Sequence, residues 1–221
     1  GTIVKNMNRA PDVNGERQSY GILRNSVNNQ DIYGAVAKLT FTATPALSFT
    51  TGADWRTATI DHFREVRDLL GGDYYLETSS SSISDFWTAD QRKRRLGDKI
   101  NYWNTNTVDW LGLFATGKYT HDALTAFATY GYSIVDYTFT DHFHKNAAGG
   151  ENYVDSGNLN GQQIKGGLNY RFTKSLSAYV NAGWVSKTPI FDGAIDDTAG
   201  VKVPDPVNEK FISYEGGIRW D

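Results

Sequence analysis

The sequence contains no cysteine, which excludes disulfide bonds, thiolate metal sites and cysteine nucleophiles. It also lacks any run near the roughly 18 consecutive apolar residues that a membrane-spanning helix needs. Basic residues are not in excess, because 22 Lys and Arg stand against 25 Asp and Glu, for a net charge of −3. This balance argues against a nucleic-acid partner, which would require a basic face.

The residues that are abundant favour β-structure. Aromatic residues make up 14% of the chain, and there are 22 glycines but only one methionine. Low average hydropathy does not exclude a membrane protein, because in a strand with one lipid-exposed face only every second side chain contacts lipid.

Apolar and polar residues alternate with period two in seven segments, which predicts strands with one apolar face. These segments are residues 32–43, 47–56, 106–119, 124–134, 163–172, 176–184 and 212–220. In the first, Tyr33, Leu39 and Phe41 share a face with three alanines, whereas Lys38 lies on the other. The opposite faces carry most of the charge: Lys38, Asp54, Arg56, Lys165, Arg171, Glu215 and Arg219. Such charges are costly in a dry core and cheap in a wide, wet or filled lumen.

The connections between these segments are sorted by length. Three are short turns, namely Thr44-Pro45-Ala46, His121-Asp122-Ala123 and Thr173-Lys174-Ser175. The others are long and polar and cover residues 68–99, 145–158 and 188–210, and residues 1–18 are expected to be a further loop. A soluble sandwich has no reason for this asymmetry, whereas outer-membrane barrels combine tight periplasmic turns with long external loops.

Each apolar row begins just after a short turn and ends near a large aromatic ring. Trp55, Tyr132 and Trp184 each lie eight residues after the first apolar residue of their row. Eight residues, tilted by about 40°, cover roughly 20 Å of the membrane normal. We therefore expect these three rings to belong to an aromatic girdle at the membrane surface.

The fold class indicated is all-β: an antiparallel transmembrane β-barrel that is incomplete. Seven strands are expected, or eight if residues 20–27 form another, and bacterial single-chain barrels have an even number. We therefore expect residues 1–221 to be a partial barrel domain within a larger polypeptide, since an open sheet edge is not stable in lipid.

Four strings carry a resemblance to a known family. Two of them are residues 22–29 followed by 33–34, and residues 97–102 leading into 108–114. The two more specific strings are Asp68-Leu69-Leu70-Gly71-Gly72-Asp73-Tyr74-Tyr75, within residues 62–75, and Val207-Asn208-Glu209-Lys210-Phe211-Ile212-Ser213-Tyr214-Glu215-Gly216-Gly217-Ile218. The chain resembles part of the barrel of TonB-dependent outer-membrane receptors, particularly those of Bacteroidetes-type bacteria. The positions that match are Asp68, Leu69, Leu70, Gly71, Gly72, Glu209, Tyr214 and Glu215.

The resemblance implies a barrel of the 22-strand class in the bacterial outer membrane, filled by a plug domain of the same polypeptide. It implies uptake of a scarce nutrient (a ferric siderophore, oligosaccharide, peptide or vitamin) with energy relayed by the TonB complex. A surface lipoprotein is a further partner in some Bacteroidetes transporters. The plug domain and the short TonB-contacting segment are not in this sequence.

Ligand-binding candidates come from aromatic and basic residues of the longest loop. Rings and guanidinium groups suit sugars, aromatic siderophores or anionic chelates. Packing of the loops against one another is the alternative explanation, and solvation is the simpler one for the basic run 92–95. The candidates are Tyr74, Tyr75, Phe86, Trp87, Arg92, Arg94 and Arg95.

No catalytic set, metal site or cofactor is expected. His142 and His144 lie two apart beside acidic residues, but exposed imidazoles at a loop are the favoured interpretation. Two alternatives to the transporter remain: a passive outer-membrane porin or channel, and a soluble β-sandwich that binds a ligand. A sandwich would need no detergent, and a porin would lack the plug.

Overall fold

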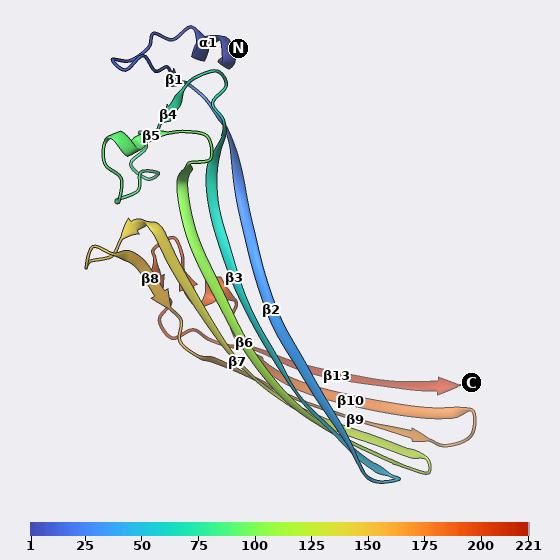
Figure 1. Ribbon diagram of the computed structural model, residues 1–221. Coiled ribbons are helices and arrows are strands. Elements are labelled where there is room, and N and C mark those ends of the chain that lie inside the picture. Colours follow the sequence, from blue (N-terminus) through green and yellow to red (C-terminus); the bar gives the residue numbers. More distant parts are fainter. Residues whose placement is uncertain (221) are drawn as a thin grey trace.

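The computed structural model describes residues 1–220, so that Asp221, the last residue of the predicted domain 1–221, lies outside it. The fold is all-β, with one large antiparallel sheet whose seven long strands follow the order β2-β3-β6-β7-β9-β10-β13 (Figure 1). The long strands are β2 (Leu23–Thr44), β3 (Leu47–Asp68), β6 (Lys99–His121), β7 (Leu124–Lys145), β9 (Leu159–Arg171), β10 (Leu176–Lys187) and β13 (Glu209–Trp220).

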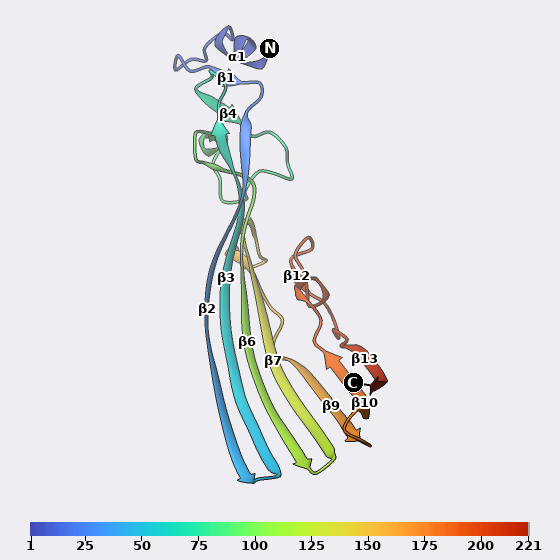
Figure 2. The same cartoon turned by 90° about the vertical axis from the view of Figure 1, so that its right-hand side faces the viewer.

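The three predicted short turns lie together at one end of the sheet (Figures 1 and 2). Two of them use the same local chemistry: the hydroxyl of Thr44 accepts the backbone N–H groups of residues 46 and 47, and that of Thr173 accepts those of residues 175 and 176. Pro45 supplies the fixed φ that suits a tight turn. The three long connections, residues 69–98, 146–158 and 188–208, leave the sheet at the other end.

The first four long strands extend well past the predicted segments, because β2, β3 and β7 have 22 residues each and β6 has 23. The apolar rows that predict the strands occupy only the half near the short turns. Beyond them β2 continues with mostly polar residues, and on β7 the buried Val135, Phe139 and Phe143 lie on the opposite face. The additional strand that residues 20–27 could form is not separate, because residues 23–27 are the first residues of β2.

Smaller elements occupy the ends of the molecule away from the short turns. Residues 1–18, predicted to be loop, instead include helix α1 and the first residue of β1. The smaller elements are α1 (Thr2–Met7), β1 (Gln18–Ser19), β4 (Tyr74–Leu76), η1 (Asp90–Arg92), β5 (Lys93–Arg94), β8 (Glu151–Asp155), η2 (Phe191–Gly193), β11 (Ile195–Asp196) and β12 (Val201–Lys202). Strands β1, β4 and β5 form a small sheet above β2 and β3, and β8 extends the edge of β7.

In the part of the chain that the structure describes, buried apolar residues form two small clusters rather than one core. The first contains Val66, Leu69 and Ile100, under the loop 69–98. The second contains Phe139, Val154 and Ile195. Both lie in the half of the sheet away from the short turns, which we call the upper half. Burial therefore stabilises the long connections rather than the half near the short turns. Among the described residues, no helix is long and apolar enough to cross a membrane.

Candidate functional site

Strand register brings the predicted apolar rows onto one continuous face of the sheet. Ala35 pairs with Trp55, Trp55 with Leu111, and Leu111 with Ile134. The same parity continues across β9, β10 and β13. We call this face the apolar belt; its larger members are Tyr33, Leu39, Phe41, Leu47, Phe49, Trp55, Leu111, Leu113, Tyr119, Leu124, Tyr130, Tyr132, Ile134, Ile164, Leu168, Tyr170, Leu176, Val180, Trp184, Ile212, Tyr214, Ile218 and Trp220.

The apolar belt is uncovered. Leu39 is 68% exposed, Ile164 54% and Ile218 80%, and no described residue packs over this face. Monomeric soluble proteins rarely expose apolar patches larger than a few hundred Å². A surface of seven such rows therefore requires an apolar environment or a covering partner.

The predicted girdle residues do not lie in one cross-strand row. Trp184 on β10 pairs with Ile164 on β9, and Ile164 pairs with Tyr130 on β7. Tyr130 pairs with Ala115 on β6, and Ala115 pairs with Thr51 on β3. Thr51 lies four residues before Trp55, on the side of the short turns. Four residues are about 13 Å along a strand, and the four strand spacings from β3 to β10 are about 19 Å. The upper border of the apolar belt is thus inclined by about 35° to the rows of paired residues.

The opposite face is polar and carries the predicted charges. Asp54 accepts a hydrogen bond from Arg56 at 2.6 Å, and Glu215 accepts one from the Tyr179 hydroxyl at 3.0 Å. Aromatic side chains lie close to glycines of this face: a Cβ at Gly52 would come within 2.5 Å of the Phe114 ring.

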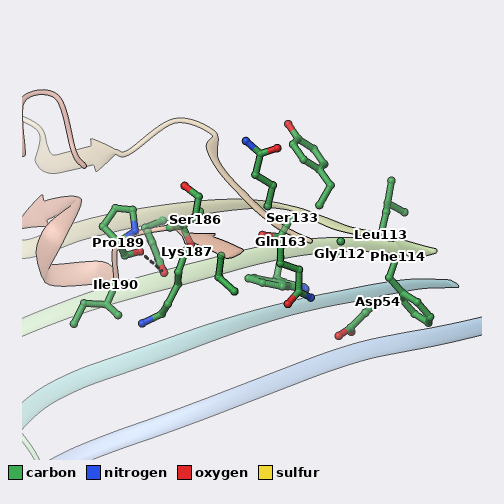
Figure 3. A pocket seen from close by; sticks show the side chains of 17 residues that line it. Asp54, Gly112, Leu113, Phe114, Ser133, Gln163, Ser186, Lys187, Pro189 and Ile190 are labelled. Carbon is green, nitrogen blue, oxygen red and sulfur yellow. Dashed lines mark hydrogen bonds between the residues drawn. The ribbon is translucent and has the colours of Figure 1, made fainter. Parts of the chain in front are cut away.

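The third long connection folds back over this polar face instead of extending freely. The ring of Phe191 packs edge-on against Tyr137 at 5.9 Å, and Ile195 is buried beside Phe139. A cavity of about 510 Å³ lies beside this segment. Residues from β3, β6, β7, β9 and the end of β10 line it (Figure 3). Its lining includes Asp54, Trp110, Phe114, Gln163, Lys187 and Ile190.

Several predicted ligand-binding residues are engaged with one another in the loop 69–98. Tyr74 is buried under the Lys93 ammonium, and Tyr75 packs against the first apolar cluster. The Arg94 guanidinium lies 4.1 Å from the centre of the Trp87 ring, and that ring contacts Phe143 at 5.0 Å. Packing of the loop therefore accounts for Tyr74 and Tyr75.

Three of the candidates nevertheless meet at a second cavity, of about 480 Å³, between this loop and the upper ends of β6 and β7. Phe86, Trp87 and Arg94 line it together with residues that sequence reasoning did not select. Lys99 is one of these, and its ammonium lies 3.6 Å from the centre of the Trp103 ring. We call this the loop cavity. Besides the three candidates, its lining residues are Ser84, Gly97, Asp98, Lys99, Trp103, His142, Phe143 and Glu151. Arg92 and Arg95 are not among its lining residues.

The two candidate histidines have protein partners. His142 bonds to Glu151 at 2.7 Å and to the Thr105 hydroxyl at 2.8 Å, and His144 bonds to Asp141 at 2.6 Å. Within residues 1–220, no group of three acidic or imidazole side chains is arranged to hold a metal ion.

The first of the two more specific family-like strings has a structural explanation. The Asp68 carboxylate accepts the N–H of Leu70, and Leu70 and Gly71 both have positive φ. A Cβ at Gly71 would lie 2.8 Å from Met7, so glycine suits both the turn and the close approach of the N-terminal segment. Leu69 is buried, and a side chain at Gly72 would collide with Ser19.

The second string lies on the edge strand β13. Glu209 pairs with Lys187 at 3.2 Å, Tyr214 is 82% exposed on the apolar belt, and Glu215 faces the polar side. These positions alternate between the two faces, as an extended strand requires.

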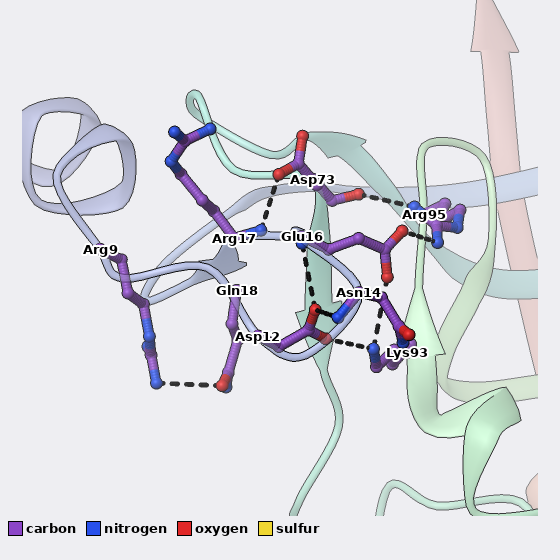
Figure 4. A network of polar contacts seen from close by, with 9 residues as sticks. All are labelled: Arg9, Asp12, Asn14, Glu16, Arg17, Gln18, Asp73, Lys93 and Arg95. Atoms are coloured by element: carbon purple, nitrogen blue, oxygen red, sulfur yellow. Dashed lines mark hydrogen bonds and ion pairs between the residues drawn. The ribbon is translucent and has the colours of Figure 1, made fainter.

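Sequence reasoning missed the N-terminal segment, residues 1–21, which we call the strap. Asn6 is fully buried, its amide donating to the carbonyls of Gly21, Leu69 and Leu70 and its oxygen accepting the N–H of Tyr20. Figure 4 shows the acidic part, in which Asp12 and Glu16 bind Lys93, and Glu16 also binds Arg95. No local pattern in the sequence predicts the contacts of the strap with the loop 69–98, because the partners lie more than 60 residues apart.

Acid should loosen the strap only below about pH 4. The hydrogen bond from Lys93 lowers the pKa of Asp12 from 3.8 to about 2, and that from Arg95 lowers the pKa of Glu16. Folding lowers the pKa of both carboxyl groups. The ionised carboxylates therefore stabilise the folded strap fully above the ordinary carboxyl pKa, and this stabilisation is lost as the pH falls through the folded-state pKa values. We expect amide protection in residues 12–17, corrected for intrinsic exchange rates, to hold from pH 7 to about 4.5 and to fall below about 4. Loss near pH 6 would contradict this assignment.

Comparison with known proteins gave no identification: no family model matches the chain, and no curated protein matches it.

Proposed function

We propose that this chain is part of the transmembrane barrel of a TonB-dependent transporter in the bacterial outer membrane. The observation that carries the proposal is the continuous, uncovered apolar belt opposite a charged, polar face. A β-sandwich would need a second layer over the belt, and residues 1–220 supply none. Lipid is the covering that a belt of this extent and alternation fits.

The inclination of the belt supports a barrel. In a barrel, rows of paired residues make the same angle with the membrane plane as the strands make with the membrane normal. The value of about 35° obtained from the register falls in the range of 35–45° typical of transmembrane barrels. With strands tilted by this angle, the border of the apolar belt would lie parallel to the membrane plane.

The direction of the edge strands supports a larger barrel. Antiparallel pairing along seven strands makes β2 and β13 run in the same direction. Joining them by antiparallel pairing therefore takes an odd number of further strands. A barrel of 22 strands would add 15, which is odd, whereas a ring made only of head-to-tail copies of this sheet would need parallel seams.

On this proposal the polar face looks into the lumen, where it contacts water and the plug domain. The long connections face the outside and bind the nutrient, for which the loop cavity is the best-formed place among the predicted candidates. TonB supplies the energy and a surface lipoprotein is a possible additional partner. The family-like strings are what favour this transporter over a passive channel.

Intact mass and N-terminal sequence of the polypeptide from detergent-solubilised outer membranes test the proposal. We expect a mass several times that of these 221 residues, with a globular domain preceding the barrel. A membrane polypeptide without such a domain would indicate the passive channel. A protein of 221 residues that is folded and soluble without detergent would rule out both.

A further inference from the structure

The basic run 92–95 is divided between two sides of the loop. Arg92 ends the short helix η1, Lys93 and Arg94 form β5, and Arg95 follows it. Along the extended chain of β5, neighbouring side chains alternate in direction. Lys93 and Arg95 turn to the strap, whereas Arg94 turns to Trp87 in the loop cavity. Adjacent cations of this run therefore have different partners: the strap for Lys93 and Arg95, and the Trp87 ring for Arg94.

The strap holds Lys93 and Arg95 from several directions. The Lys93 ammonium lies 2.5 Å from Asp12, 3.3 Å from Glu16 and 4.5 Å from the centre of the Tyr74 ring. Arg95 binds Glu16 and donates to the backbone carbonyl of Asp73 at 3.1 Å. Figure 4 shows both cations converging on the strap.

Backbone contacts tie the same region together. Strand β1 of the strap pairs in parallel with β4, and β4 pairs with β5, so that Tyr75 lies opposite Arg94. Arg17 donates its N–H to the Asp73 carboxylate at 2.7 Å and accepts the N–H of Asp73 at 2.8 Å. A shift of the strap would therefore move β4 and β5, and with them the backbone that carries Arg94.

Arg94 has few other restraints. Its guanidinium donates to the Gln91 carbonyl at 2.9 Å, its Nε has no hydrogen-bond partner, and its nearest carboxylate, on Asp98, is 3.8 Å away. Its place on Trp87 thus depends on how β5 is held.

We propose that Asp12 and Glu16 are positioning residues, which hold Lys93 and Arg95 so that Arg94 and Trp87 are presented to the loop cavity. This inference rests on the proposed function only in taking that cavity as the place where the nutrient binds. The positioning itself is a property of the strap and the loop, and it can be measured without a ligand.

The test compares the intact polypeptide with its Asp12→Asn/Glu16→Gln variant in detergent. Amide exchange of residues 77–98 should accelerate by about tenfold, because exposed ion pairs of this kind shift local opening modestly. Acrylamide quenching of Trp87, obtained as the difference from matched Trp87→Phe proteins, should rise by about twofold. The control is Glu209→Gln, which removes the exposed Lys187 pair elsewhere in the molecule.

A charge exchange separates positioning from general structure. Glu16→Arg alone should open the loop, and Glu16→Arg combined with Arg95→Glu should restore Trp87 protection. If the variants fold poorly, wild-type protein at 1 M salt, where the Debye length is about 3 Å, should show the same increase in Trp87 quenching. Unchanged exchange and quenching in the double neutral variant, or no recovery on charge exchange, would overturn the inference. If only the mass test failed, the proposed transporter function would be overturned, and the positioning role of Asp12 and Glu16 would stand.

Discussion

Ala115→Arg should prevent stable insertion into the outer membrane that we propose for this protein, whereas Thr116→Arg should be tolerated. Ala115 lies in the middle of the apolar belt, and Thr116 is on the polar face of the same strand. A lipid-facing arginine near the bilayer midplane costs about 2–4 kcal/mol. At position 116 the main loss is one hydrogen bond to Thr129, at 2.9 Å, and its contribution is about 0.5–1.5 kcal/mol.

The measurement is the amount of heat-modifiable, folded protein in outer-membrane fractions, followed by the free energy of unfolding in lipid vesicles. The two variants add the same side chain to adjacent residues, so expression and overall charge are matched. Equal tolerance of both variants would mean that lipid does not contact the belt. Greater sensitivity at position 116 would reverse the assignment of the two faces.

Replacing Phe139 with alanine should detach residues 188–203 from the polar face of the sheet. Phe139 is 2% exposed and packs with Val154 and Ile195, and the Phe191 ring lies 6.5 Å away. Removing a buried phenylalanine ring costs about 3–5 kcal/mol. The second apolar cluster is small, so little other burial remains to keep the segment in place.

Amide exchange of Ala194 and Val203, whose N–H groups bond within the segment, reports the detachment. We expect local opening to increase by about a hundredfold or more. The matched control is Phe127→Ala, because Phe127 is on the same strand and face but 39% exposed. If the two substitutions had equal effects, packing on Phe139 would not be what holds the segment.

The parts of the fold that depend on local pattern were predictable. Period-two alternation identified all seven long strands, because side chains of an extended chain necessarily point to alternate faces. Thr44 and Pro45 marked their turn because hydroxyl capping and a fixed φ act over a few residues. The same locality explains why strand lengths were underestimated. Beyond the belt β2 is mostly polar, and the apolar residues of β7 change to the opposite face, so that the alternation of the belt does not continue.

The candidate site was predictable only as a collection of residue types. Phe86, Trp87 and Arg94 do line one cavity, but Tyr74 and Tyr75 support the loop and Arg95 binds the strap. Adjacent residues such as Arg94 and Arg95 have the same chemistry in the sequence. Only the direction of an extended backbone, set by pairing with β4, gives them different partners.

The sequence by itself determined the strands, their two faces and the separation of short turns from long connections, because these follow from alternation and from residues close together in the chain. The tertiary structure decided that the apolar rows join into one inclined belt, that residues 188–208 fold over the polar face, and that the strap holds the loop 69–98. Those arrangements depend on strand register and on contacts such as Asn6 with Leu69, 63 residues apart. Pairing between distant segments is set by the global fold and leaves no periodic trace in the sequence.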